Sequence, residues 1–269
     1  MSYLNEMFGL DGKTVVITGG AGAIGTAMSK TFLQAGANVI IWDRSQEQLD
    51  NAKEKLTDYT NGRLKVLISD TSEEKAVEVS LQESIQYFGQ IDILVNGVGG
   101  NIGKGPFVDI DMEQFTKVLH MNLVAGLVVP TKVFAKYWIK NNIKGNIINL
   151  ASMTSYVPLS GVWAYDAAKS GVQNLTMATA NEFAGNDIRV NALAPGFFIG
   201  KQNKDLLIDK ETGGYTERGQ SVIDRTPYKR FGDIDELAGA TLFLASNKAA
   251  GFVTGISVPV DGGYLIHNI

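Results

Sequence analysis

The sequence contains no cysteine and only two histidines among its 269 residues. The missing cysteines exclude disulfides, a thiol nucleophile and thiolate metal sites. His120 lies in an apolar helical run and His267 lies in the tail, and two isolated histidines do not make a metal site. No metal is therefore expected, and any chemistry must come from other side chains.

Excess charge is also missing. The chain has 24 basic and 28 acidic residues, a formal net charge of −4 and 45% hydrophobic residues, so nothing indicates a nucleic-acid surface or a disordered tail. The first six residues lack the basic start and apolar core of a signal peptide, and we expect no apolar stretch of membrane-spanning length. A cytoplasmic protein that acts on a small molecule, with no nucleic-acid or membrane partner, is expected.

Segments typical of strands and helices alternate along the chain without a linker or repeat. The runs expected to form strands are 13–18, 37–43, 64–68, 91–95, 145–151, 188–193 and 255–260. Residues 111–140 are expected to form one long helix, and capping-box spacing at Thr71 and Glu74, and at Asp233 and Glu236, predicts two helix starts. The pattern predicts an α/β fold over residues 1–269: one Rossmann-type doubly wound domain with seven parallel strands and helices on both faces.

A glycine-rich turn follows the first expected strand. Residues 19–25 read Gly-Gly-Ala-Gly-Ala-Ile-Gly, and such a turn lets backbone N–H groups approach a pyrophosphate at the start of the next helix. A plain connection could have the same composition, but the second strand ends in Asp43, where a carboxylate would bind the adenosine ribose hydroxyls. Arg44 could bind a phosphate there instead, so we expect NAD as cofactor, with NADP as an alternative.

Ser152, Tyr165 and Lys169 form the candidate acid/base group. Tyr165 and Lys169 stand four apart in a helical run, so both project from one face, although such a pair usually marks only a partly exposed helix face. A phenol with a reference pKa near 10 needs a nearby positive charge to exchange protons near neutrality, and Lys169 could supply it. Ser152 follows an apolar strand, where its hydroxyl could bond a substrate oxygen.

With these motifs in this order, the chain resembles the single-domain branch of the short-chain dehydrogenase/reductase family, from about Leu10 to Tyr264. The residues that carry the resemblance are Thr18-Gly19 through Ile24-Gly25, Asp70, Asn96-Gly97-Val98-Gly99, Asn122, Ser152, Tyr165 with Lys169, Pro195-Gly196 and Asp261-Gly262-Gly263. The chain departs from the family pattern at Ala23, at Gly97-Val98 and at Gly200, where family members often have glycine, asparagine-alanine and a threonine that touches the nicotinamide carboxamide.

The resemblance implies hydride transfer between a nicotinamide and a carbonyl or carbinol carbon. Tyr165 would act as acid or base, Lys169 would lower its pKa and bind the nicotinamide ribose, Ser152 would orient the substrate oxygen, and Asn122 would help hold a water in the proton path. The implied cofactor contacts are Gly19, Ala23, Ile24, Gly25, Asp43, Arg44, Asp70, Thr71, Asn96, Gly97, Val98, Tyr165, Lys169, Pro195, Gly196 and Phe198. A homotetramer or homodimer is also implied. A non-catalytic sensor is the competing interpretation, but such proteins typically lose the tyrosine or lysine.

Two segments are expected to meet the substrate. Residues 197–231 are rich in charge, and although a solvated surface loop could look the same, a loop this long beside the sheet edge is interpreted as a substrate lid. Its cations are Lys201, Arg218, Arg225, Lys229 and Arg230, and the expected substrate contacts are Asn101, Ser152, Tyr165, Lys201, Gln202 and Asn203.

The same segments refine the resemblance. The runs 194–203, 216–219 and 96–101 resemble fructuronate reductases, also called mannonate oxidoreductases, which act in hexuronate catabolism. D-fructuronate and D-mannonate are therefore the expected substrates. Gluconate, polyol or other keto-sugar dehydrogenases remain open as alternatives.

Overall fold

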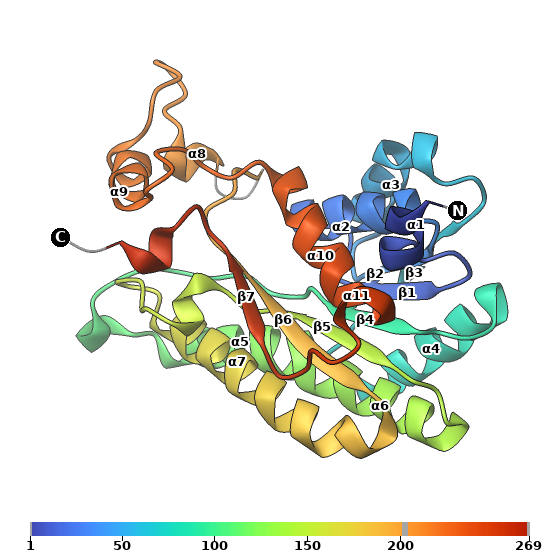
Figure 1. Ribbon diagram of the computed structural model, residues 1–269. Coiled ribbons are helices and arrows are strands. Elements are labelled where there is room, and N and C mark those ends of the chain that lie inside the picture. The colour runs from blue at the N-terminus through green and yellow to red at the C-terminus, as the bar shows by residue number, and fades with distance from the viewer. Residues whose placement is uncertain (1, 201–203, 268–269) are drawn as a thin grey trace.

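Seven apolar runs of the sequence form the strands of one parallel sheet in the computed structural model, which describes residues 2–200 and 204–267 (Figure 1). The strands are β1 (Thr14–Thr18), β2 (Asn38–Asp43), β3 (Leu64–Ile68), β4 (Ile93–Asn96), β5 (Asn146–Leu150), β6 (Arg189–Pro195) and β7 (Ser257–Val260). Their order is β3-β2-β1-β4-β5-β6-β7, and every neighbouring pair is parallel. The expected doubly wound sheet of seven strands in a single domain is confirmed.

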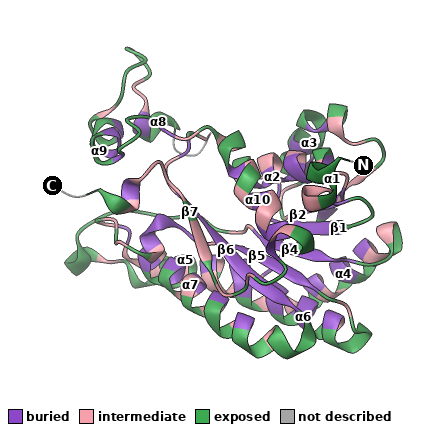
Figure 2. Ribbon diagram, in the orientation of Figure 1, coloured by how far each residue is buried: buried purple, intermediate pink, exposed green. Residues whose placement is uncertain are grey.

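Helices connect the strands and cover both faces of the sheet. They are α1 (Tyr3–Phe8), α2 (Ala23–Gln34), α3 (Gln46–Lys55), α4 (Glu74–Phe88), α5 (Met112–Leu119), α6 (Val129–Asn141), α7 (Trp163–Phe183), α8 (Lys204–Leu207), α9 (Glu217–Arg225), α10 (Ala238–Ala245) and α11 (Asn247–Ala250). In Figure 1, α2, α3 and α10 lie above the sheet and α4, α5, α6 and α7 lie below it. The five inner strands between these layers are almost entirely buried, whereas the edge strands β3 and β7 are mostly half-buried or exposed (Figure 2).

The alternating side chains of the strands feed two apolar cores. Val15 and Ile17 of β1 pack with Phe32 of α2 on the upper face, whereas Val16 packs with Phe134 and Trp138 of α6 on the lower face. Successive strand side chains point to opposite faces, so a parallel strand covered on both sides needs apolar residues at every position. This is why the strands read as continuous apolar runs in the sequence.

The strand order places a ligand crevice at the edge of the sheet where the strands have their carboxyl ends. The strand order reverses between β1 and β4, and loops from these two strands leave the sheet in opposite directions there. In open α/β sheets, ligands bind at such a reversal point. The fold therefore brings the glycine-rich turn after β1 together with the loop after β4.

Three local expectations need correction. Thr71 is buried and is not a helix cap; α4 starts after Glu73 without a side-chain cap, and the nearby Asp70 accepts hydrogen bonds from the N–H and hydroxyl of Ser72. The long helix is continuous but contains a π-helical segment, His120–Val128, between α5 and α6. Residues 204–231 are not an irregular loop. By contrast, the capping box of Asp233 and Glu236 is confirmed.

The composite helix Met112–Asn141 also overturns the expectation about membrane-spanning stretches. By length and composition alone it could cross a membrane, and it is the one such helix in the described part of the chain. More than half of its most apolar window is buried, and it packs against α4, α7 and β4. A core helix passes the same test, so this feature is weak evidence for a membrane span.

Helices α8 and α9 form a small unit that projects from the sheet edge (Figure 1). We call residues 204–231 the α8–α9 segment. Leu207, Val222, Ile223 and Phe231 make an apolar cluster of their own there. Short-range packing of this kind explains how a charge-rich stretch folds without joining either main core.

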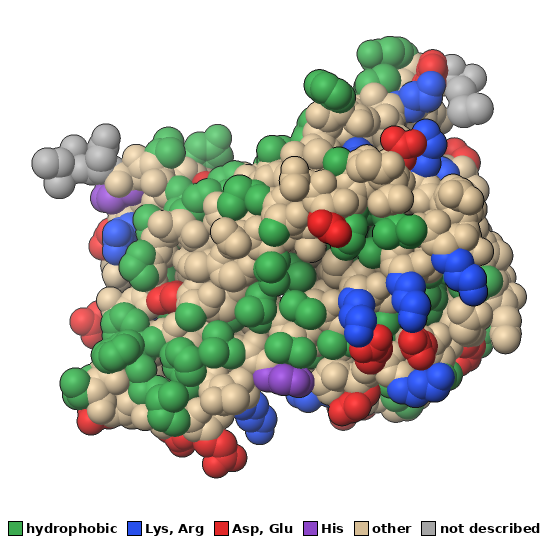
Figure 3. Space-filling model, turned by 90° about the horizontal axis from the view of Figure 1, so that it is seen from below, with side chains coloured by type: hydrophobic (Ala, Val, Ile, Leu, Met, Phe, Trp, Pro, Cys, Tyr) green, Lys and Arg blue, Asp and Glu red, His purple; other side chains and the backbone are tan. Residues whose placement is uncertain are grey.

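The lower face carries side chains of several kinds. In Figure 3, hydrophobic side chains gather at one end of this face, and basic and acidic side chains intermingle at the other. Phe107, Val108 and Met112 are among the exposed apolar residues before and at the start of α5. The mixed signs of charge form no basic patch in this view, in keeping with the composition.

Candidate active site

Ser152, Tyr165 and Lys169 come together at the carboxyl ends of the strands. Ser152 lies two residues after β5, and Tyr165 and Lys169 lie in the first two turns of α7. The Lys169 ammonium is buried, donates to the carbonyl oxygen of Leu150 at 2.7 Å and lies 5.6 Å from the centre of the Tyr165 ring. The Ser152 hydroxyl accepts from the Thr154 N–H at 3.2 Å and lies close enough to the Tyr165 phenol to lower the pKa of that phenol. One phenol is thus flanked by a hydroxyl and a buried ammonium.

Burial controls the titration of this group. Desolvation raises the pKa of the Tyr165 phenol, and the Ser152 hydrogen bond opposes that rise while the nearby Asp166 charge adds to it. Desolvation also lowers the pKa of the Lys169 ammonium to about 8. The expectation of a lowered Tyr165 pKa is therefore wrong for this structure, because desolvation outweighs the favourable contacts and the ammonium donates to the Leu150 carbonyl.

Asn122 lies fully buried in the π-helical segment and holds the loop after β4. Its side-chain amide donates to the carbonyl oxygens of Gly100 at 2.7 Å and Val118 at 2.9 Å, and its oxygen accepts from the Gly100 N–H at 3.0 Å. A Cβ atom on Gly99 would lie 2.7 Å from this oxygen and 3.2 Å from the Lys169 nitrogen. Asn122, Gly99 and Lys169 therefore form one packed group.

The glycine-rich turn has the shape that a dinucleotide requires. Gly19 has a φ of +60°, and a Cβ atom there would lie 2.9 Å from the Cα of Val98. A Cβ atom on Gly25 would lie 2.5 Å from the Cα of Gly20. Helix α2 begins at Ala23 without a side-chain cap, so its first N–H groups, including that of Ile24, are open to an anion. These residues fit a pyrophosphate.

The residues expected near the adenosine gather at the ends of β2 and β3. Asp43 ends β2, and its carboxylate accepts from the Ser45 N–H at 3.2 Å. Hydrogen bonds from Ser72 lower the pKa of the Asp70 carboxyl, and the charges of Arg44 and His120 act in the same direction. Thr71, the other residue expected here, is buried beside Asp70. Arg44 is therefore close to a carboxylate, which already balances part of its charge.

The remaining expected cofactor contacts line the ends of β4 and β6. Asn96 donates to Asn149 at 2.8 Å and to Thr131 at 2.9 Å, which ties β4 to β5 and α6. The Gly97 N–H donates to the Thr18 hydroxyl at 3.2 Å. Pro195 ends β6, a Cβ atom on Gly196 would lie 2.6 Å from the Cα of Asp261, and Phe198 is buried.

The expected substrate contacts fare differently. Lys201, Gln202 and Asn203 lie outside the described residues. The Asn101 amide donates to the carbonyl oxygen of Gly103 at 2.7 Å, so it stabilises its own loop. Ser152 and Tyr165 alone among the expected substrate contacts are brought together by the described structure.

Three of the expected cations of the α8–α9 segment have local partners, and a fourth, Arg218, is exposed. Arg230 pairs with both carboxylate oxygens of Glu236, at 2.6 and 2.7 Å, and the Lys229 ammonium donates to the Asp224 carbonyl at 2.7 Å. The Arg225 guanidinium lies 5.5 Å from the centre of the Tyr264 ring. These three groups are engaged where they stand. The sequence could not show this, because residue type alone does not reveal whether a cation is paired with another group.

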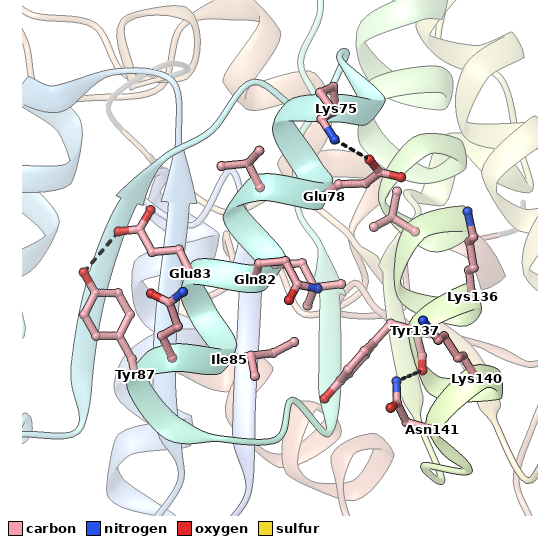
Figure 4. Close-up of a pocket in the computed structure, with 14 residues that line it drawn as sticks. Lys75, Glu78, Gln82, Glu83, Ile85, Tyr87, Lys136, Tyr137, Lys140 and Asn141 are labelled. Atoms are coloured by element: carbon pink, nitrogen blue, oxygen red, sulfur yellow. Dashed lines mark hydrogen bonds and ion pairs between the residues drawn. The ribbon is translucent and has the colours of Figure 1, made fainter.

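A surface groove lies elsewhere, between α4 and α6 (Figure 4). Its walls carry Tyr137, Lys136 and Lys140 from one helix and Glu78 and Tyr87 from the other. The groove lies on the lower face and includes none of the acid/base residues, so it is not the catalytic crevice. No group of metal-ligating residues occurs anywhere in the described chain.

Two residues that the sequence reasoning passed over border the crevice. Trp163 begins α7 and donates from its indole N–H to the Gly105 carbonyl at 3.0 Å. Asp166 is buried next to Tyr165 in sequence, and desolvation raises the pKa of its carboxyl. Their positions within three residues of Tyr165 were the available signal.

Comparison with known proteins matches this geometry. A family model described as enoyl-(acyl carrier protein) reductase matches residues 19–265. The uncharacterized oxidoreductase UxuB of Bacillus subtilis is 39% identical over 273 residues, which cover 96% of this chain and 97% of that protein.

Two solved structures are similar over the whole chain. A protein of Haemophilus influenza, proposed to be a D-mannonate oxidoreductase and crystallised with bound NAD, has a TM-score of 0.90 and 32% identity, with 99% of each chain covered. A gluconate 5-dehydrogenase of Burkholderia cenocepacia, in complex with NADP and tartrate, has a TM-score of 0.87 and 30% identity, with 99% of this chain and 100% of that chain covered. The chain therefore belongs to the short-chain dehydrogenase/reductase family and is an NAD(P)-dependent oxidoreductase that acts on a CH–OH group.

Proposed function

We propose that the protein interconverts a keto-uronate and a sugar acid, with D-fructuronate and D-mannonate as the pair and NAD as the preferred cofactor. The observation that carries this proposal is the meeting of Ser152, Tyr165 and Lys169 beside the glycine-rich turn. The similarity to a proposed mannonate oxidoreductase with bound NAD supports the substrate class. Asp43 supports NAD, since its carboxylate can bond both ribose hydroxyls and would repel a 2′-phosphate.

In the proposed mechanism, a bound nicotinamide supplies or accepts the hydride, and the protein handles the proton. Tyr165 gives its phenolic proton to the carbonyl oxygen during reduction and takes it back during oxidation. Ser152 donates a hydrogen bond that orients the same oxygen. Lys169 holds positive charge beside the phenol below about pH 8, and Asn122 holds the loop that packs on the Lys169 nitrogen. The α8–α9 segment, together with the residues before it, would act as the substrate lid.

Comparing a charged and a neutral substrate tests the proposed substrate class. The purified protein is assayed with NADH and NADPH against fructuronate and fructose, which carries an alcohol in place of the carboxylate. A charge-assisted contact contributes about 1.5–3 kcal/mol, so fructuronate should be preferred by roughly ten- to a hundredfold in kcat/KM. Equal use of both sugars would contradict a sugar-acid substrate.

Gluconate is the second candidate substrate, because the solved gluconate 5-dehydrogenase covers the chain as completely as the proposed mannonate oxidoreductase does. The same assay, run in the oxidative direction with mannonate and gluconate, separates the two. A higher kcat/KM for gluconate would move the assignment to that sugar acid.

A further inference from the structure

The loop after β4, residues 99–105, is attached to the acid/base group at its first end. Gly99 packs so closely on Lys169 that a Cβ atom there would lie 3.2 Å from the ammonium nitrogen. Gly100 exchanges two backbone hydrogen bonds with the buried Asn122 amide, at 2.7 and 3.0 Å. The loop therefore starts from a fixed point beside the catalytic lysine.

The second end of this loop is attached to the start of α7. The Gly105 N–H donates to the Gly161 carbonyl at 3.2 Å, and the Trp163 indole donates to the Gly105 carbonyl at 3.0 Å. The ring of Phe107 packs edge-on against Trp163, with the ring centres 5.5 Å apart. The loop is therefore held at its first end by the π-helical segment, beside Lys169, and at its second end by the start of α7, which carries Tyr165.

Lys104 lies between these two anchors. Its side-chain stem crosses Gly161, where an added Cβ atom would lie 2.8 Å from Cγ and 3.2 Å from Cε of Lys104. Gly161 has a φ of +82° and stands in the segment that joins Ser152 to Tyr165. The residue is exposed, and its ammonium makes no hydrogen bond or ion pair within residues 2–200 and 204–267.

Lys104 is better placed than the paired cations of the α8–α9 segment. Arg230 and Lys229 already bind a carboxylate and a carbonyl, and Lys210 pairs with Asp205 at 2.7 Å. Recruiting any of them would first break an existing contact. Lys104 needs no such exchange, and its stem lies on the segment bracketed by the two residues that would hold the substrate oxygen.

We infer that Lys104 binds the carboxylate of the substrate and thereby sets the preference for sugar acids over neutral sugars. The inference rests on the proposed function, in which the substrate carbonyl lies at Ser152 and Tyr165. The Lys104 stem crosses Gly161, two residues before α7 begins, so the substrate carboxylate would lie on the side of the reacting oxygen that faces this segment.

Charge-removing and charge-keeping variants test this assignment. Wild type, Lys104→Met and Lys104→Arg are assayed with fructuronate and fructose as the matched pair. Lys104→Met keeps most of the apolar stem, so it should lower kcat/KM for fructuronate by roughly ten- to a hundredfold and leave fructose within about twofold. Lys104→Arg should retain most of the preference. Lys140→Met, at an exposed lysine of α6, is the control and should change kcat/KM for neither substrate. Lys204→Met tests the α8–α9 segment directly.

The outcomes separate the two ideas. A wild-type enzyme without any preference for fructuronate overturns the proposed function and this inference with it. A preference that survives in Lys104→Met overturns the inference alone, and its loss in Lys204→Met would assign the carboxylate to the α8–α9 segment instead. Equal losses for fructuronate and fructose in Lys104→Met would show a structural role and also overturn the inference.

Discussion

The loop after β4 and the α8–α9 segment border the same edge of the sheet but are held in opposite ways. The loop, residues 99–105, is joined to Asn122, Gly161 and Trp163, so its contacts reach the elements that carry the acid/base residues. The α8–α9 segment has an apolar cluster of its own and internal hydrogen bonds from Lys229 and Thr216.

This difference suggests that the loop positions groups for the reaction, whereas the α8–α9 segment controls access to the site. A loop tied to the catalytic helix can place a group relative to the reacting oxygen, because its position depends on the same elements. A segment with its own small core can move as a unit with little loss of buried surface, which suits a lid. Charge density in the sequence pointed to the α8–α9 segment, whereas the contacts point to the loop.

The largest effect on turnover should come from a substitution in the acid/base group, to which the loop after β4 is attached. Tyr165→Phe keeps the ring and removes the phenolic hydroxyl, so turnover should fall by at least about 10²-fold, as for a lost general acid/base. Steady-state kinetics give turnover, and fluorescence titration with NADH should show unchanged cofactor binding. Near-normal turnover would remove Tyr165 from the chemistry.

The second largest effect should be a change in the preference for NADH over NADPH when Asp43 is replaced. Asp43→Ala should raise the KM for NADH far more than that for NADPH, by roughly tenfold or more in the ratio, because a charged hydrogen-bond acceptor for the ribose hydroxyls is lost. Glu47→Ala, an exposed acid in the first turn of α3, is the matched control. An unchanged ratio would show that Arg44 or another group sets the selectivity.

A smaller effect is expected at the base of the α8–α9 segment. Glu236 accepts from Arg230 and from the Asp233 N–H, so Glu236→Ala removes both contacts at once. Limited proteolysis within residues 204–231 should become faster and the substrate KM should rise several-fold, with kcat within about twofold. The control is Glu211→Ala, an exposed acid of the same segment. A large fall in kcat would mean that this segment takes part in the chemistry.

The smallest effect should be a shift in pH dependence. The Asp166 charge raises the pKa of Tyr165, so Asp166→Asn should lower that pKa. Oxidation needs the deprotonated phenol, and its rise in rate with pH should therefore move to lower pH. Reduction needs the protonated phenol, so its alkaline decline should also move to lower pH. Rate profiles in both directions measure the shift, and a move to higher pH would contradict the assignment.

Most of the fold could be predicted from local patterns. Apolar runs between helical segments define the parallel strands, because a strand covered on both faces needs apolar residues at every position. The capping box at Asp233 and Glu236 could also be predicted from the sequence, because its hydrogen bonds join residues only three apart. The prediction of a capping box at Thr71 is wrong, because Thr71 is buried by tertiary packing and the residue before the first turn of α4 is Glu73.

The sequence by itself determined which reacting groups this protein has and in what order they occur: a glycine-rich turn, an acid after β2, and the residues Ser152, Tyr165 and Lys169. These are features of residue type and short spacing. Only the tertiary structure decided the titration of the phenol, since burial depends on distant elements, and only it showed which cations are already paired. The location of Lys104 over Gly161 belongs to the second kind, because the two residues lie on different loops that the sheet brings together.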